Sequence, residues 1–187
     1  IVPSSYTPGA RNRAMIIYSG TEGANVMASN MLSVGPAMGL GDVIVAVLDG
    51  KTYFGNGQAG ATALDYLRAK YNVDNDRTYL LSESAGTSAG LKLGLQLRQS
   101  YFAAYWANDV NASATPVKSA AQLGFSPWGN AGPGGQFTAA NAIVAGMKSK
   151  GYRLPPDAPY SGPGASQHGN TQQFMAALKF FGGKSRK

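Results

Sequence analysis

Short apolar runs alternate with longer segments of helical spacing along most of the chain, and this alternation limits the fold more than any other feature. Runs rich in β-branched and aromatic residues predict buried strands at residues 14–18, 43–48, 78–81 and 102–106, with a weaker one at 123–125. The segments between and after them predict helices at residues 24–37, 60–71, 87–99, 136–150 and 171–181. Strands that alternate with helices form a parallel sheet with helices packed on it, so we expect an α/β fold.

The length of 187 residues fits one ordinary domain, and we expect a single domain over residues 1–187. A chain of this size leaves little room for a large inserted lid. No apolar run approaches the roughly 20 residues that cross a bilayer, so no membrane span is expected. The chain begins at Ile1, which fits a secreted protein with its signal removed or a trimmed piece of a longer protein. The compartment and the oligomeric state stay open.

Composition excludes several kinds of chemistry. The chain has no cysteine, which excludes disulfides, thiolate catalysis and thiolate metal sites. One histidine and nine scattered carboxylates do not suggest a metal site. The glycine-rich residues 55–60 and 129–135 lack the Lys-Ser/Thr of a phosphate-binding loop, so no cofactor is expected. The net charge of +7 is spread along the chain and its one dense cluster lies at the C-terminus, so no nucleic-acid partner is expected.

A serine flanked by small residues follows one of the predicted strands directly. Residues 76–86 read D-R-T-Y-L-L-S-E-S-A-G, in which a short apolar strand runs into Ser84 and a helical segment begins just after it. Small neighbours permit a nucleophile elbow, a sharp strand-to-helix turn that raises a serine hydroxyl above the edge of the sheet. The free amides at the start of the helix then point toward a developing oxyanion. The segment predicts Ser84 as a nucleophile.

A second serine fits the G-x-S-x-G pattern more closely. Ser88 is the centre of G-T-S-A-G at residues 86–90, whereas the pattern around Ser84 has Ser82 in place of the first glycine. Ser88 is about one helical turn beyond the predicted end of the strand, where its hydroxyl would not stand at a strained turn. We therefore favour Ser84, with Ser88 or an ordinary serine-rich turn as the alternatives.

Residues 76–86 resemble the D-R-V-Y-(apolar)-x-G-x-S-A-G signature of α/β-hydrolase esterases. The group with this signature includes polyhydroxybutyrate depolymerases, feruloyl esterases, esterase D and enterochelin esterases. Residues 1–6 resemble the entry strand of that family, and residues 43–49 the strand before its elbow helix. The resemblance implies an α/β-hydrolase fold, with a mostly parallel central sheet, helices on both faces and no large lid, and a serine esterase activity.

His168 is the only histidine, and it lies in the Gly/Ser-rich loop at residues 162–169, just before the last predicted helix. The resemblance places the catalytic base of the family here, and the chain order Ser, acid, His also matches. A serine hydroxyl is a poor nucleophile without such a base. We predict His168 as the general base, with a structural histidine as the alternative.

The acid that would orient His168 has three candidates. Asp109 follows the strand predicted at residues 102–106, at a position that some α/β-hydrolases use, and a carboxylate there could hold the imidazole in the right tautomer. The position that is commoner in the family falls at residues 128–133, which contain no carboxylate. We favour Asp109 over Asn130 as a neutral substitute and over Asp157 on the loop before His168. A role of Asp109 as a helix or turn cap is the structural alternative.

The oxyanion hole is expected to combine two backbone amides, those of Ala85 after the nucleophile and of Thr21 in the loop at residues 19–23. Many relatives have His-Gly where this chain has Ser-Gly at residues 19–20, but a backbone donor does not depend on that side chain.

Two function classes follow. In the first, the protein hydrolyses carboxylic esters through an acyl-enzyme on Ser84, acting on small soluble esters or, as the runner-up, on a polyester or a feruloylated sugar. Transfer of the acyl group to an acceptor other than water stays open. In the second, the same cleft serves a binding protein that has lost catalysis. The missing first glycine of the pattern and the absent His-Gly keep this second class open.

Overall fold

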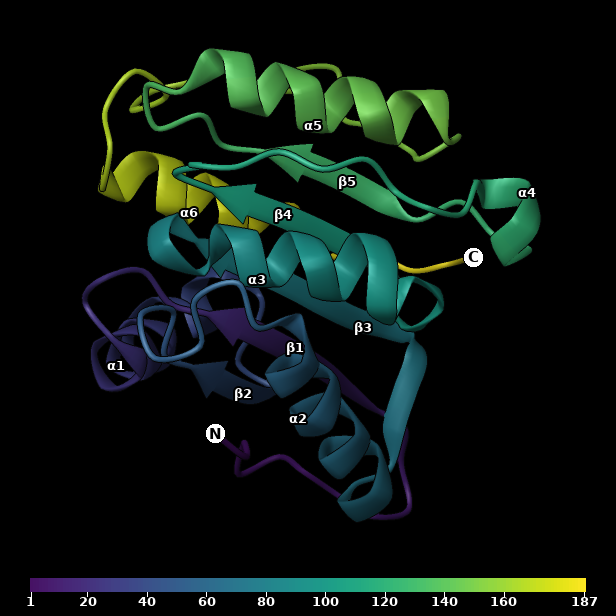
Figure 1. Ribbon diagram of the computed structural model, residues 1–187. Helices are drawn as coiled ribbons and strands as arrows, with labels where there is room; N and C mark the ends of the chain where they lie inside the picture. Colours follow the sequence, from purple (N-terminus) through teal and green to yellow (C-terminus); the bar gives the residue numbers. More distant parts are fainter.

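The computed structural model describes all 187 residues and contains one sheet of five parallel strands in the order β2-β1-β3-β4-β5 (Figure 1). The strands are β1 (Asn12–Tyr18), β2 (Ile44–Leu48), β3 (Val73–Glu83), β4 (Ala104–Asn108) and β5 (Trp128–Ala131). The helices are α1 (Ala24–Val34), α2 (Gly57–Lys70), α3 (Thr87–Lys92), α4 (Ala120–Leu123), α5 (Phe137–Ser149) and α6 (Thr171–Phe180).

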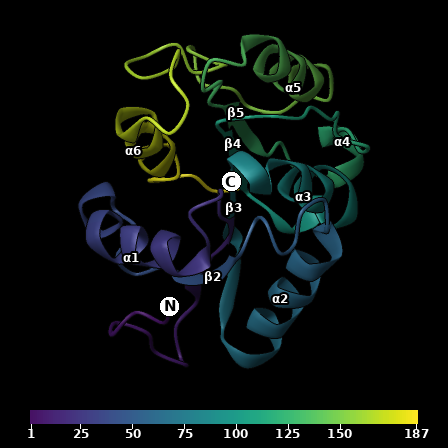
Figure 2. The same cartoon turned by 60° about the vertical axis from the view of Figure 1, so that its left-hand side comes forward.

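Helices cover both faces of the sheet, as Figure 2 shows with α1 and α6 on one side and α2, α3 and α5 on the other. Alternate residues of each strand point to opposite faces, and two apolar cores result. Ile16 of β1 packs in the core beneath α2, α3 and α5, whereas its neighbours Met15 and Ile17 pack beneath α1 and α6. Strands buried on both faces read as continuous apolar runs, which is why residues 14–18 and 43–48 were recognisable.

The strand order reverses its direction at β1. The chain passes from β1 to β2 on one side, crosses back to β3 on the other side, and continues outward through β4 to β5. Ligands of open α/β sheets bind outside the carboxyl ends of the strands at such a reversal. The loops that follow β1 and β3 therefore meet where a site is expected.

The weak strand predicted at residues 123–125 is wrong, since α4 ends there and the fifth strand is β5. Ser119 and Gln122 form a capping box, in which the Gln122 N–H donates to Ser119 Oγ and the Ser119 N–H donates to the Gln122 side chain. Gly124 then ends the helix at a φ of 77°. β5 escaped recognition because W-G-N-A contains a glycine and an asparagine, which are rare in strands.

Two predicted helices end earlier than expected. The helix predicted at residues 87–99 is α3 followed by a π-helical turn, η3 (Leu93–Leu97), and the one at residues 24–37 stops before the 3-10 turn η1 (Pro36–Met38).

Residues 1–6, which resemble an entry strand, form no strand. Only Ile1 pairs with the edge of the sheet, where its N-terminal amino group donates to the Val45 carbonyl at 2.7 Å and its carbonyl accepts from the Val45 N–H at 2.9 Å. Every helix is too short or too polar to cross a membrane.

Candidate active site

Ser84 stands at the sharp turn between β3 and α3. Its φ of 46° lies in the left-handed region, and a 3-10 turn, η2 (Ser84–Gly86), joins it to α3. Among the residues other than glycine, only Asp109, with a φ of 48°, also has a positive φ. Such strained residues cost about 1–3 kcal/mol each and cluster at functional sites. Because Asp109 follows β4 and Ser84 follows β3, both lie at the carboxyl edge of the sheet.

Glycines let the elbow lie close against the neighbouring strand ends. A Cβ on Gly86 would come within 2.6 Å of the Ser19 carbonyl oxygen, and a Cβ on Gly50 would come within 2.8 Å of the Gly86 backbone nitrogen. Both obstacles are backbone atoms, which cannot rotate away. The close approach therefore requires glycine at both positions and holds Ser84 at the end of β3.

The serine that replaces the first glycine of the pattern is accommodated inside the fold. Ser82 Oγ lies 3.0 Å from the buried Tyr105 hydroxyl, and a Cβ on Gly90 would come within 2.3 Å of Ser82 Cβ. Gly90 therefore provides the room for Ser82, which explains one of the two glycines around Ser88. Ser88 itself lies within α3 and lines a different cavity with Lys92.

His168 reaches Ser84 from the loop that precedes α6. Its Nε2 lies 2.9 Å from Ser84 Oγ, although the two residues are 84 positions apart in the chain. In the tautomer that leaves Nε2 unprotonated, this nitrogen accepts a hydrogen bond from the serine hydroxyl. The Asn170 side chain caps α6 by accepting from the Gln172 N–H at 2.9 Å, which anchors the end of the same loop. The structure thus brings together the predicted nucleophile and the predicted base.

Asp109 lies one residue beyond β4 and is 1% exposed. Its Oδ2 accepts the backbone N–H of Gly169 at 2.6 Å, and its Oδ1 accepts the side-chain amide of Gln173 at 2.7 Å. These bonds go to the residue after His168 and to α6, and neither goes to the imidazole. Asp109 therefore holds the backbone of the histidine loop in this structure. A Cβ on Gly134 would come within 2.2 Å of Asp109 Oδ1, so glycine is needed there as well.

The two other candidate acids lie apart from this cluster. Asn130 is inside β5, in register with Trp106, and its Oδ1 accepts the N–H of Ala131. Asp157 is exposed on its loop. Both line a cavity of about 280 Å³ whose walls include neither Ser84 nor His168.

The predicted oxyanion donors flank the elbow. Ala85 is the residue after Ser84 in η2 and is 9% exposed. Thr21 is exposed in the loop that follows β1, and its backbone N–H donates to no acceptor within the chain. The neighbouring Gly20 N–H donates to Glu22 Oε1 at 2.9 Å, so the side chain of Glu22 folds back over this loop. Their service as an oxyanion hole stays a prediction.

A buried carboxyl that the sequence analysis did not single out precedes the nucleophile. Glu83 is 7% exposed and accepts the Asn108 side-chain amide at 2.8 Å, while the Trp106 indole N–H donates to Asn108 Oδ1 at 3.0 Å. Burial, and then the neighbouring Asp109 carboxylate, raise the pKa of Glu83 well above its ordinary value. The available signal was a charged residue at the end of the buried half of β3, residues 78–83.

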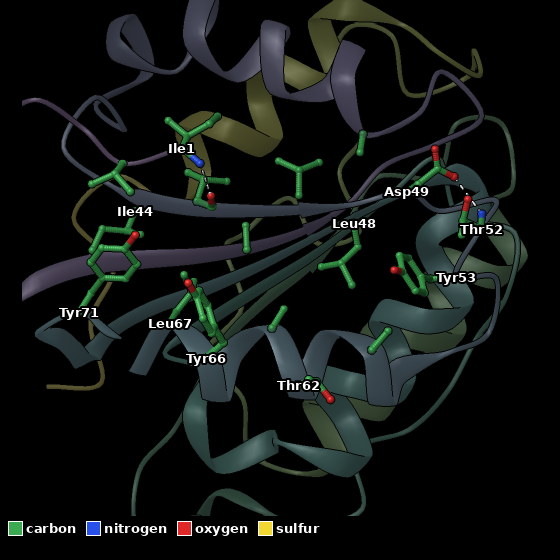
Figure 3. A pocket seen from close by; sticks show the side chains of 17 residues that line it. Ile1, Ile44, Leu48, Asp49, Thr52, Tyr53, Thr62, Tyr66, Leu67 and Tyr71 are labelled. Atoms are coloured by element: carbon green, nitrogen blue, oxygen red, sulfur yellow. Dashed lines mark hydrogen bonds between the residues drawn. The ribbon is translucent and has the colours of Figure 1, made fainter. Parts of the chain in front are cut away.

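The largest cavity lies away from these residues. It has a volume of about 1000 Å³ and runs along the outer edge of β2 and over α2, with Ile1 on one side and Tyr66 on the other (Figure 3). We call it the β2 groove. Fourteen of its 17 lining residues are hydrophobic, and neither Ser84 nor His168 is among them.

A cavity of about 350 Å³ lies next to the site instead, lined by Glu22, Glu83, Gly169 and Phe174 among others. No cluster of three or more His, Asp or Glu side chains is arranged to hold a metal ion.

The parallel sheet, its order and the strained serine between β3 and α3 define an α/β-hydrolase fold, as the sequence resemblance implied. The chain superposes on a protein described as a thermostable esterase with a TM-score of 0.67 and 13% identity, over 99% of this chain and 58% of that one. It thus spans somewhat more than half the length of that esterase. It also superposes on a protein described as m3DLH with a TM-score of 0.61 and 17% identity, over 95% of this chain and 88% of that one. No protein-family model and no curated protein matches the sequence.

Proposed function

We propose that the protein is a serine hydrolase that cleaves carboxylic esters, with Ser84 as nucleophile and His168 as general base. One observation carries the proposal: Ser84 Oγ, held at a φ of 46°, lies 2.9 Å from the Nε2 of the sole histidine. A strained serine in hydrogen-bonding contact with an imidazole has the geometry that nucleophilic acyl transfer needs. The likeness in fold to a protein described as a thermostable esterase supports this choice of reaction.

The reaction proceeds in two halves. Ser84 Oγ attacks the ester carbonyl carbon while its proton passes to His168 Nε2, and the N–H groups of Ala85 and Thr21 stabilise the oxyanion of the tetrahedral intermediate. The carbon–oxygen bond to the alcohol then breaks, and the alcohol leaves with the proton from His168. Water attacks the acyl-enzyme, its proton passes to His168, and collapse of the second intermediate returns the proton to Ser84 and releases the carboxylic acid.

Asp109 is proposed as the acid of the triad. Its buried carboxylate holds the N–H of Gly169 at 2.6 Å and so fixes the position of the histidine loop. A carboxylate beside the loop also stabilises the imidazolium that forms during catalysis. Small soluble esters are the proposed substrates, with a polyester or a feruloylated sugar as the runner-up, in keeping with the sequence resemblance.

A fluorophosphonate probe tests the nucleophile. We expect the wild-type protein to be labelled on Ser84 and the Ser84→Ala variant to lose all labelling. The Ser88→Ala variant is the matched control, since it removes the other serine of the overlapping pattern, and it should label as the wild type does. Labelling that survives in Ser84→Ala and disappears in Ser88→Ala would move the nucleophile to Ser88. No labelling of the folded wild-type protein would favour a non-catalytic binding protein.

A further inference from the structure

We propose that Gln173 is a positioning residue, which holds the carboxylate of Asp109 in place and, through it, the loop that carries His168. The inference rests on the proposed function for its catalytic consequence, but not for the contacts themselves. Gln173 is the third residue of α6, and it is fully buried although its side chain is polar. Burying an amide is costly unless its donor and its acceptor are both used, so its partners indicate what it holds.

A backbone donor fixes the orientation of this amide. The Gly134 N–H, in the turn after β5, donates to Gln173 Oε1 at 3.1 Å. Because a backbone N–H can only donate, the oxygen of the amide must face Gly134, and the nitrogen faces the other way. Gln173 Nε2 donates there to Asp109 Oδ1 at 2.7 Å. The glutamine thus presents a donor, and no acceptor, to the carboxylate.

Asp109 passes this constraint on to the histidine loop. Its second oxygen, Oδ2, accepts the Gly169 N–H at 2.6 Å. Because Gln173 holds one oxygen and Gly169 the other, the carboxylate group cannot turn without breaking one of the two bonds. Hydrogen bonds to a charged group are also stronger than those between neutral groups. Gly169, the residue after His168, is therefore fixed relative to α6.

The turn after β5 holds the same loop at a second point. The Gly135 N–H donates to the Ala165 carbonyl at 2.9 Å, three residues before His168. A Cβ on Gly132 would come within 3.0 Å of Gln173 Nε2, so glycine there lets the side chain lie against the end of β5. The ends of β4 and β5 and the start of α6 therefore meet at one amide. The loop is tied to this junction on both sides of His168.

Removal of the amide tests the effect on catalysis. Gln173→Met keeps the length of the side chain but removes both of its hydrogen bonds, and we expect kcat to fall about 10- to 100-fold. KM should stay within about threefold, because Gln173 does not line the cavity beside Ser84. Wild-type kcat in Gln173→Met would overturn the proposal.

A second buried glutamine provides the matched control. Gln99 precedes β4, at the opposite end of that strand from Asp109. Its Nε2 donates to the Lys118 carbonyl at 2.6 Å, and its Oε1 accepts the Lys118 N–H at 2.9 Å. Gln99→Met should therefore lower Tm as Gln173→Met does, but it should keep kcat within about twofold. An equal loss of kcat in the two variants would reduce Gln173 to a structural residue and overturn the proposal.

Gln173→Glu gives a pH profile that a merely structural residue would not. In its protonated form the introduced carboxyl group offers a donor and an acceptor in the places of the amide, whereas its ionised form has no donor and repels Asp109. The titratable groups nearby are Asp109, Glu83, which is bonded to the adjacent Asn108, and His168, which precedes Gly169.

The ratio of kcat in Gln173→Glu to kcat in the wild type should therefore be highest at the acid end of the activity range and fall as the pH rises. At the acid end Gln173→Glu should exceed Gln173→Met by at least about fivefold in kcat. A ratio that rises with pH, or a loss as large as that of Gln173→Met at every pH, would overturn the proposal.

A further readout needs no enzyme activity. The Gly169 N–H is bound by the carboxylate that Gln173 holds, so the hydrogen exchange of this amide, followed by NMR, reports the contact directly. At the same pH its exchange should be about 10-fold faster in Gln173→Met than in the wild type, and within about threefold of the wild type in Gln99→Met. Unchanged exchange in Gln173→Met would overturn the proposal. Faster exchange in a protein that has no esterase activity would contradict the proposed function alone.

Discussion

β2 and β3 both pair with β1, one on each side, yet the two strands end in different surroundings. β3 has β4 on its other side, and its end carries the crowded polar cluster of Ser84, His168 and Asp109. β2 is the edge strand, and beyond the single pair formed by Ile1 and Val45 its outer side opens into the β2 groove. The largest apolar cavity is usually the first hypothesis for a site. Here its size follows from the open edge of the sheet, whereas Ser84 and His168 meet at the carboxyl ends of the strands.

The two regions also differ in strain and polarity. The ends of β3 and β4 hold the two non-glycine residues with positive φ, a serine–imidazole hydrogen bond and two buried carboxyl groups. The groove has mostly aliphatic and aromatic walls, with Asp49 at one end. A large cavity without a nucleophile and a base supplies binding area but no reaction. Converging side chains, rather than the volume of a cavity, therefore indicate where this fold can carry chemistry.

The largest expected effect separates the two regions directly. His168→Ala removes the only base within reach of Ser84, so ester hydrolysis should fall by roughly 10⁴-fold or more in kcat. Tyr66→Ala in the β2 groove is the matched control. It should keep kcat within about twofold, because the Tyr66 side chain lines the groove and not the cavity beside Ser84. Initial rates on a short-chain nitrophenyl ester measure both. Equal losses in the two variants would mean that the groove takes part in catalysis.

A smaller effect is expected at the acid. Asp109→Asn preserves the shape but leaves an amide facing one of the N–H donors of Gly169 and Gln173, and kcat should fall by about 10² to 10⁴. Asp157→Asn, on the exposed loop, should change kcat by less than about twofold. Steady-state kinetics on both variants, with circular dichroism to verify folding, provide the measurement. Retention of full activity in Asp109→Asn would exclude Asp109 as the acid.

The smallest effect concerns stability alone. The Tyr18 hydroxyl donates to the Asn56 carbonyl at 2.8 Å and accepts the Gly60 N–H at 2.7 Å, which ties β1 to the start of α2, the helix that forms one wall of the groove. Burial raises the pKa of Tyr18 to about 12, so the hydroxyl is neutral at ordinary pH. Tyr18→Phe leaves both partners unsatisfied and should lower the free energy of unfolding by about 1–3 kcal/mol.

Denaturant unfolding measures the change in Tyr18→Phe, and kcat at 25 °C should stay within about twofold of the wild type. A large loss of kcat without a loss of stability would show that the groove side of β1 is coupled to the site.

Much of the fold was predictable because buried parallel strands leave a strong local signal. β1 and β2 are continuous apolar runs, and α5 has apolar residues at helical spacing, so their existence and type follow from residues close in the chain. β5 was not predicted because Gly129 and Asn130 are unusual residues in a strand. They fit there because of the residues that pack against them. A Cβ on Gly129 would come within 2.4 Å of the Met147 sulfur, a contact made by a residue of α5 that no local pattern could indicate.

The sequence by itself determined that a serine with small neighbours follows a buried strand and that the chain offers one histidine as its possible base, since residue types and the neighbours of Ser84 are local facts. Only the tertiary structure decided that Nε2 of His168 lies 2.9 Å from Ser84 Oγ, that Asp109 holds the N–H of Gly169, and that Glu83 accepts the side-chain amide of Asn108. Those relations join segments many residues apart, and their distances depend on how parallel strands register and how helices pack on them. Local propensity carries no information about such distances.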